Sequence, residues 1–268
     1  MRKTIFATFI LIFVILIHLS FKTNSPFTLI KSTDITGDYI TTDNLGNVYL
    51  VNDNKLWMYD DSGNLLYTYS SLIDGNINGL DVSNPLKILV FYKDFGRIKY
   101  LDNKLSVKGD YIALQDLSLE QASTACSSYE NSFWVYDPLS IKLVRIDQNL
   151  QVNQISGNVS QLTGLTFSPT YMAEFNNALY ISDTLNGILI FDRYGGYIKA
   201  LPIKNIHFFQ IINNKLAYYE SGSIITVDLK TYEETKTEIP DKIALCTRIE
   251  QNKLYVLTSK KLNIYRFN

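Results

Sequence analysis

Cysteine and histidine are scarce in this chain of 268 residues, which contains two of each. Two cysteines cannot form the framework of a disulfide-rich domain or of a cysteine-rich zinc domain. Neither sign of charge is in excess, because 25 lysines and arginines stand against 26 aspartates and glutamates. This balance excludes an acidic disordered chain and provides no basic stripe for nucleic acid or anionic lipid. The chain is instead 46% hydrophobic and 13% aromatic, which is enough for a large core.

Motifs of several enzyme classes are also absent. The sequence has no G-x-S-x-G, no glycine-rich phosphate loop and no C-x-x-C pair. After the first 25 residues it keeps one histidine, His207, and a single imidazole cannot supply a multi-histidine metal site. We therefore expect His207 to be structural and the protein to carry no cofactor.

The first 25 residues have the pattern of an export signal. Arg2 and Lys3 precede an apolar run of 13 residues, 5–17, and a polar stretch follows it. A membrane-spanning helix needs about 20 apolar residues, so this run is typical of a secretory signal. We predict a signal peptide over residues 1–25, with an uncleaved membrane anchor as the alternative. The protein is then exported and is periplasmic, envelope-associated or secreted.

A repeat of about 40 residues organises the remainder of the chain. Short runs of β-branched and aromatic residues recur six times, at intervals of 40, 45, 46, 37 and 38 residues. The runs are NVYLV from Asn47, KILVF from Lys87, SFWVY from Ser132, ALYIS from Ala178, KLAYY from Lys215 and KLYVL from Lys253. A weaker run precedes each one, and two further runs follow it in the first five repeats. Four strands in a unit of this length predict a blade of a β-propeller.

We predict an all-β fold over residues 26–268, a six-bladed β-propeller with four antiparallel strands per blade in a single domain. The sixth repeat stops after its third run, at Phe267, and an unused strand-like run, FTLIKST, starts at Phe27. We expect this N-terminal run to complete the last blade and close the ring, because closure removes exposed sheet edges. A two-sheet sandwich is the alternative, but it gives no reason for six copies of a four-strand unit.

Two of the repeats resemble a known superfamily. The segments DNLGNVYLVNDNKLWMYDDSGNLLYTY, from Asp43, and NNALYISDTLNGILIFDRYGGYIKAL, from Asn176, are similar to blades of NHL and TolB-like six-bladed propellers. The resemblance covers the whole chain after the leader in architecture and these two blades in motif. It implies a propeller fold. It leaves function open, because such propellers include enzymes, receptors and scaffolds.

Acidic residues form the first candidate site. Asp81, Glu130, Glu174 and Glu250 fall on predicted inner strands, where they are best placed to converge on a central channel. In the resembling calcium-dependent sugar lactonases, channel acids and asparagines bind the ion, and Glu174 with Asn176 or Asn131 matches part of that set. The rest of the lactonase motif is missing.

Acids also recur between the second and third strands of the repeats. Here a short acidic side chain can organise a tight turn by accepting hydrogen bonds from nearby backbone N–H groups. These residues are Asp53, Asp94, Asp137, Asp183 and Glu220.

Tyrosines form the second candidate site. We expect Tyr92, Tyr129, Tyr136 and Tyr171 at exposed loops, where tyrosine offers contact area and a hydroxyl group. The longest apparent insertions, residues 103–121 and 156–172, should mark the binding rim, because loop insertions on a propeller extend one face.

The two cysteines are expected to be free. Cys126 and Cys246 fall on inner strands of the third and sixth repeats, on opposite sides of the channel. A disulfide needs Cα atoms about 4.4–6.8 Å apart, so this placement predicts two free, buried thiols.

These observations favour a non-enzymatic protein-binding or scaffolding module of the cell envelope, in which a rigid ring presents loops at a small entropic cost. The partner is expected to be another envelope or extracellular protein, with no nucleic acid, and with membrane contact only through an uncleaved leader. A metal-dependent lactonase or hydrolase with acids at the channel mouth is the alternative. A small-ligand sensor with a deep open channel is a second alternative. The oligomeric state is left open.

Overall fold

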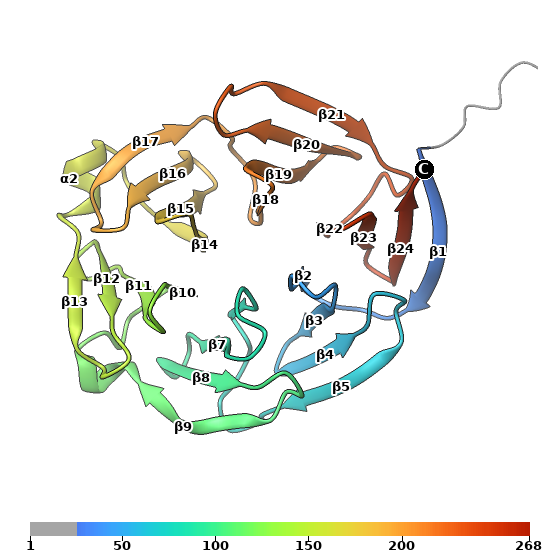
Figure 1. The fold of residues 1–268 in the computed structure, drawn as a ribbon. Helices are drawn as coiled ribbons and strands as arrows, with labels where there is room; N and C mark the ends of the chain where they lie inside the picture. The colour runs from blue at the N-terminus through green and yellow to red at the C-terminus, as the bar shows by residue number, and fades with distance from the viewer. Residues whose placement is uncertain (1–25) are drawn as a thin grey trace, which may run out of the picture.

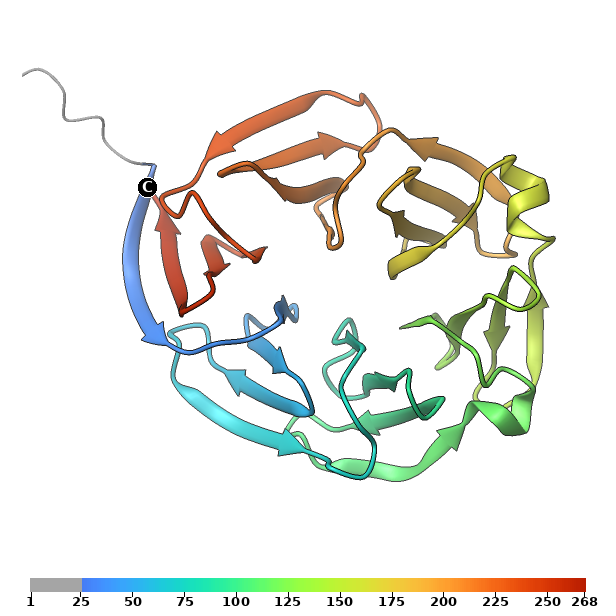
Figure 2. The ribbon, with the colours of Figure 1, turned by 180° about the vertical axis from the view of Figure 1, so that it is seen from behind.

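Six four-stranded antiparallel sheets are arranged as blades of a closed ring (Figures 1 and 2). This computed structural model describes residues 26–268, so the predicted signal peptide lies outside the described residues. Within that range no helix has the length and hydropathy to cross a membrane. The predicted six-bladed propeller is confirmed, including four strands in every blade.

The blades follow one another along the chain. Blade 1 contains β2 (Tyr39–Thr42), β3 (Val48–Asn52), β4 (Lys55–Tyr59) and β5 (Leu65–Ser70). Blade 2 contains β6 (Gly79–Asp81), β7 (Ile88–Tyr92), β8 (Arg97–Leu101) and β9 (Val107–Ala113). Blade 3 contains β10 (Thr124–Ser127), β11 (Phe133–Asp137), β12 (Lys142–Ile146) and β13 (Val152–Ile155).

The second half of the ring has the same plan. Blade 4 contains β14 (Pro169–Phe175), β15 (Ala178–Asp183), β16 (Gly187–Asp192) and β17 (Tyr197–Leu201). Blade 5 contains β18 (Gln210–Ile212), β19 (Lys215–Glu220), β20 (Ser223–Asp228) and β21 (Glu234–Glu238). Blade 6 contains β22 (Cys246–Glu250), β23 (Lys253–Leu257), β24 (Lys261–Phe267) and β1 (Phe27–Asp34). Two short helices, the 3-10 helix Leu114–Leu117 and α2 (Val159–Thr163), lie between blades.

The hydrophobic core lies between adjacent blades. Every residue of β7 and β11 is buried, whereas the outer strand β5 is mostly exposed. On β11, Phe133 packs into the cluster shared with blade 2, and its neighbour Trp134 packs into the cluster shared with blade 4. Successive side chains of a strand point to opposite faces, and both faces of this strand are covered. The strongest apolar runs in the sequence are therefore the middle strands of the blades.

The N-terminal strand closes the ring, as the sequence predicts. β1 pairs with β24 in an antiparallel register that runs from Phe27 opposite Phe267 to Asp34 opposite Lys261 (Figure 1). The Phe27 ring lies 5.0 Å from the ring of Phe267. β1 thus supplies the outer strand of blade 6, which has four strands like the other blades.

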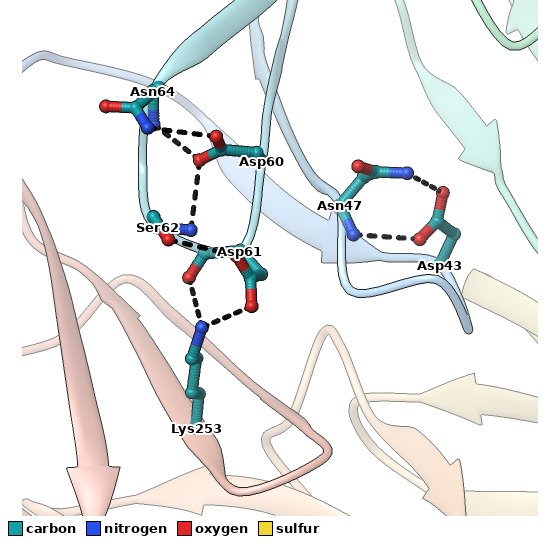
Figure 3. Close-up of polar contacts among 7 residues, drawn as sticks. All are labelled: Asp43, Asn47, Asp60, Asp61, Ser62, Asn64 and Lys253. Atoms are coloured by element: carbon teal, nitrogen blue, oxygen red, sulfur yellow. Dashed lines mark hydrogen bonds and ion pairs between the residues drawn. The ribbon is translucent and has the colours of Figure 1, made fainter.

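A lysine joins blade 6 to blade 1 beside this seam. Lys253 Nζ lies 2.5 Å from Asp61 Oδ2 and 2.7 Å from the Asp61 carbonyl oxygen (Figure 3). The hydrogen bond from Lys253 is the largest cause of the lowered pKa of Asp61. Lys31 of β1 also donates to the side-chain oxygen of Asn64, over 3.0 Å. Two lysines of blade 6 therefore form polar contacts with blade 1.

Two D-x-x-G-N loops in blade 1 have the same hydrogen bonds. Asp60 Oδ1 accepts the N–H groups of Ser62 and Asn64, over 2.9 and 2.7 Å (Figure 3). Asp43 Oδ1 accepts the equivalent N–H groups, including that of Asn47 over 2.9 Å. The asparagine amide donates to the second carboxylate oxygen in both loops. The motif in the sequence therefore encodes a turn.

The same turn recurs after the third strand of four more blades. In each, one aspartate oxygen accepts backbone N–H groups from the residues that follow it. The aspartates are Asp102, Asp147, Asp192 and Asp228. Between second and third strands, Asp137 and Asp183 accept backbone N–H groups in this way as well.

One expected insertion proves to be regular structure. Most of residues 103–121 belong to the turn at Asp102, to β9 and to the 3-10 helix Leu114–Leu117. The strand was missed because VKGDYIA lies at the outer edge of its blade, where most side chains face solvent and apolar alternation is weak. The second insertion, 156–172, contains α2 and the start of β14.

A buried carboxylate connects blades 1 and 2. Asp74, in the connection between them, is buried and bonds to Lys99, Ser71 and, over 3.2 Å, Arg97. Burial raises the pKa of Asp74, but hydrogen bonds from Lys99 and Ser71 outweigh it, so the pKa lies below its usual range. The connection depends on an ionised Asp74.

Loss of the Phe27 ring should weaken the seam. Phe27 is 6% exposed, whereas Leu29 on the same strand is 52% exposed. We expect Phe27→Ala to lower the free energy of unfolding by about 3 kcal/mol. The matched control, Leu29→Ala, should change it by less than about 0.5 kcal/mol, both measured by urea denaturation. Equal effects of the two variants would contradict the role of β1 in closure.

Asp74 should give a pH-dependent contribution to stability. Its folded-state pKa is lowered, so its contribution is present above the unfolded pKa of about 3.9 and is lost as pH falls through the folded value. We expect Asp74→Asn to lower the free energy of unfolding by about 2 kcal/mol at pH 7. The difference from wild type should shrink below about pH 4. A difference that stays constant down to low pH would show that the charge has no part in it.

Candidate functional site

The two faces of the ring carry different kinds of segment. The connection face holds the links between successive blades together with the turns between second and third strands. Those links are residues 35–38, 71–78, 114–123, 156–168, 202–209 and 239–245. The aspartate face holds the remaining loops, which include the aspartate turns of Figure 3.

A cavity of about 310 Å³ occupies the central channel on the aspartate face, and we call it the channel cavity. It is lined mainly by inner strands of five blades. Its charged and aromatic lining residues are Asp43, Asp81, Tyr171, Glu174, Phe175, Phe209, Arg248 and Glu250. The sequence placed Asp81, Glu174 and Glu250 at the channel, and the structure brings all three to this one cavity.

Aromatic rings close the channel on its other side. Phe208 stacks on Tyr39 with ring centroids 5.0 Å apart, and Tyr171 meets both Phe208 and Phe209 edge to face. Beyond them lies a hollow of about 300 Å³ on the connection face, which shares no lining residue with the channel cavity. The channel cavity and this hollow are therefore lined by different residues, and the channel cavity lies on the aspartate face. His207 lines the hollow on the other side.

The three channel acids differ in the hydrogen bonds that they accept. Asp81 accepts a backbone N–H group at each oxygen, from Ser83 over 2.9 Å and from Ser127 over 2.8 Å. Burial raises the pKa of Glu250, and the N–H group of Gln251 lowers it less. Asp81 is thus a structural acceptor, whereas Glu250 retains capacity for a ligand.

Glu174 belongs to a polar network at the channel wall. Its Oε2 accepts the Ser128 hydroxyl over 2.5 Å and the Trp134 indole N–H over 2.8 Å. Arg145 Nε in turn donates to the Ser128 hydroxyl over 2.8 Å. A buried arginine, a hydroxyl, a carboxylate and an indole are therefore linked in one chain of hydrogen bonds.

A second, polar cavity of about 410 Å³ adjoins the channel cavity, and the two share Ser83 and Glu174. Glu130 lines this polar cavity and lies outside the channel cavity, so it does not join the other three acids. Tyr129 also lines it, with its ring between the guanidinium groups of Arg145 at 3.5 Å and Arg193 at 4.3 Å. Tyr129 is a half-buried packing centre on this face.

The expected exposure of Tyr92 and Tyr136 is wrong. Both are buried, because they end middle strands that pack between blades. The Tyr92 hydroxyl lies 2.9 Å from the hydroxyl of Tyr69, and the Tyr136 hydroxyl donates to the Phe167 carbonyl. Tyr171 lies in the channel instead of on a rim, and burial raises its pKa to about 12.

The cysteines and acids do not form a metal site. Cys126 and Cys246 are free and buried, and burial raises the pKa of the Cys126 thiol. Across residues 26–268, no group of three histidine, cysteine, aspartate or glutamate side chains could hold a metal ion.

A patch of leucines on the connection face was missed in the sequence. Leu139 and Leu185 are 72% and 70% exposed at turns of blades 3 and 4, and exposed Leu162 lies on α2 between them. Asn158 donates to the Ser140 carbonyl over 3.2 Å, and Asn186 donates to the Thr166 carbonyl over 2.7 Å. These bonds hold the α2 segment against both turns. Apolar residues at turn tips, in PLS and TLN, are the signal that could have revealed the patch.

Arg248 on β22 was also missed. It is 3% exposed, lines the channel cavity and donates through Nη1 to the Phe209 carbonyl over 2.8 Å. In the sequence it lies in CTRIE, an inner-strand segment with an ordinary mixture of polar and apolar residues. No pattern distinguishes a buried arginine there from an exposed one.

Solved structures share the fold, although no protein-family model and no curated protein sequence matches the chain. Virginiamycin B lyase from Staphylococcus aureus is 13% identical, with a TM-score of 0.61, over 90% of this chain and 100% of the other. The Pan2 WD40 domain of Neurospora crassa is 8% identical, with a TM-score of 0.60, over 90% and 95%. BamB from Moraxella catarrhalis is 9% identical, with a TM-score of 0.54, over 90% and 100%. These likenesses agree with the propeller resemblance at the level of the fold.

The network at Glu174 should contribute to stability. Its removal leaves the Trp134 indole N–H and the Ser128 hydroxyl without their acceptor. We expect Glu174→Ala to lower the free energy of unfolding by about 2 kcal/mol, and Glu174→Gln, which keeps an acceptor, to lower it by about 1 kcal/mol. The control Glu130→Ala, at an exposed side chain of the polar cavity, should have little effect in the same urea titration. Equal losses for Glu130→Ala and Glu174→Ala would refute this ranking.

Proposed function

We propose that this protein is an exported, non-enzymatic β-propeller that binds another protein, in the cell envelope or outside the cell, through its connection face. The leucine patch is the observation that carries the proposal. Exposed apolar side chains gathered on one face of a protein are typical of sites that bury against a partner. Export rests on the pattern of residues 1–25 alone.

The surroundings of the patch suit an interface core. The segments that form it, 138–141, 156–168 and 184–186, contain no charged residue. Interface cores are depleted of charge, because a charge buried without a partner loses its hydration. The patch is also held in shape by the hydrogen bonds of Asn158 and Asn186. Little ordering entropy should be lost when a partner binds.

Further apolar side chains continue the surface around the same face. They are aliphatic and well exposed, and they lie in links between other blades: Leu72, Ile73, Ile243 and Leu245. The expected tyrosine rim is thus replaced by an aliphatic one. The propeller fold, which the chain shares with the WD40 domain named above, is compatible with such a role.

The leucine patch can be tested against a matched surface. We expect the double variant Leu139→Ser and Leu185→Ser to lose about tenfold or more of its partner in cross-linking and affinity purification from native membranes. The control carries Leu45→Ser and Leu86→Ser, at leucines of similar exposure, 62% and 61%, on the aspartate face, and should retain the partner. Both should unfold at the wild-type temperature, because all four side chains are exposed.

Purified components complete the test. The recovered protein should bind the purified wild-type propeller in a pairwise assay. It should bind the purified Leu139→Ser and Leu185→Ser double variant about tenfold or more weakly. Equal recovery by the patch variant and the control would overturn the proposal. So would a patch variant that loses binding to lipid vesicles while it keeps every protein partner, because the patch would then be a membrane contact.

A further inference from the structure

The channel cavity contains a buried positive charge that the described chain leaves without an anionic partner. Arg248 makes one side-chain hydrogen bond, from Nη1 to the Phe209 carbonyl, and its Nε has no partner. None of the ion pairs among residues 26–268 includes it. A guanidinium group has five N–H donors and stays charged when buried.

The other buried arginine, Arg145, has interactions that offset the hydration it loses on burial. Arg145 donates to the Ser128 hydroxyl and to the Tyr129 carbonyl, each over 2.8 Å. The Tyr129 ring lies 3.5 Å from its guanidinium carbon, and Glu130 lies at 3.9 Å. Arg248 has no carboxylate at such a distance, and its nearest ring, that of Tyr171, is 5.9 Å away. A buried charge in this state lacks the interactions that normally offset its lost hydration.

The same cavity also offers acceptors. Glu174 uses Oε2 for its hydrogen bonds with Ser128 and Trp134, which leaves Oε1 available, and Glu250 is the second acid with spare capacity. The partly exposed ring of Tyr171 also lines the cavity. The cavity therefore presents a guanidinium group, two carboxylates and an aromatic ring to a ligand.

We propose that the channel cavity binds a small zwitterion of the amino-acid class. Its carboxylate would pair with Arg248, its ammonium group with Glu174 and Glu250, and its side chain would lie against Tyr171. The planar guanidinium fork matches a carboxylate, to which it can donate two parallel hydrogen bonds. A volume of about 310 Å³ is at the lower end of the range for ligand sites and suits one amino acid.

Other ligand charges fit less well. A dianion such as phosphate would be repelled by Glu174 and Glu250, and a simple cation would leave Arg248 without a counter-ion. A zwitterion satisfies both signs at once. The site opens on the aspartate face, opposite the leucine patch, so this inference stands or falls separately from the proposed protein partner.

Matched ligands test the two charges. The twenty common amino acids would be screened one at a time by thermal shift, and the strongest binder measured by isothermal titration calorimetry. We expect its amide, which lacks the carboxylate, and its N-acetyl derivative, which lacks the ammonium group, each to bind about tenfold or more weakly. Failure of every amino acid to bind would overturn the proposal, as would derivatives that bind as tightly as the parent.

Matched variants test the residues. We expect Arg248→Gln and Glu250→Gln each to weaken binding about tenfold or more, and Glu130→Gln, in the adjoining polar cavity, to leave it unchanged. Glu250→Gln is nearly isosteric and keeps the test open if Arg248→Gln does not fold. The Nε resonance of Arg248 should also shift when the amino acid binds to the wild-type protein. An unchanged affinity in a folded Arg248→Gln or Glu250→Gln variant would refute the assignment.

Discussion

The pairing of β1 with β24 is the contact on which the rest of the ring depends. Residues at opposite ends of the described chain form one sheet, with Phe27 opposite Phe267 and the Thr28 hydroxyl donating to Asn268. Without it, the last blade would be a three-stranded sheet with an open edge, and the contact of blade 6 with blade 1 through Lys253 and Asp61 would lose its support. Because every core cluster is shared by neighbouring blades, an open ring would leave apolar surface in water.

The sequence predicts the architecture well because every blade needs the same kinds of residue at the same places. A middle strand covered on both faces needs a continuous apolar run, such as SFWVY from Ser132, and a tight turn needs an acid or a glycine at a fixed place. These features depend on residues that are close together in the sequence, so the sequence alone predicts them. The outer strands are harder to find. VKGDYIA has few apolar contacts, and the prediction placed an insertion there.

The candidate sites are less accessible to such reasoning, because they depend on which side chains meet across blades. Asp81, Glu174 and Glu250 could be placed at the channel by strand order, but Glu130 lies in a loop after β10 and opens into the adjoining cavity. Tyr92 and Tyr136 were placed at loops, although the blades on either side bury them. The isolation of Arg248 becomes visible only when every possible partner in three dimensions is known.

The position of the closing strand also has a consequence for biosynthesis. A polypeptide emerges from the ribosome with β1 long before β24, and the Thr28 and Asn268 side chains that finally meet are 240 positions apart. The first strand must therefore wait, unpaired, until nearly the whole chain has been made. Blades 1 to 5 contain only consecutive strands, so blade 6 alone must wait for β24 before its sheet can be completed.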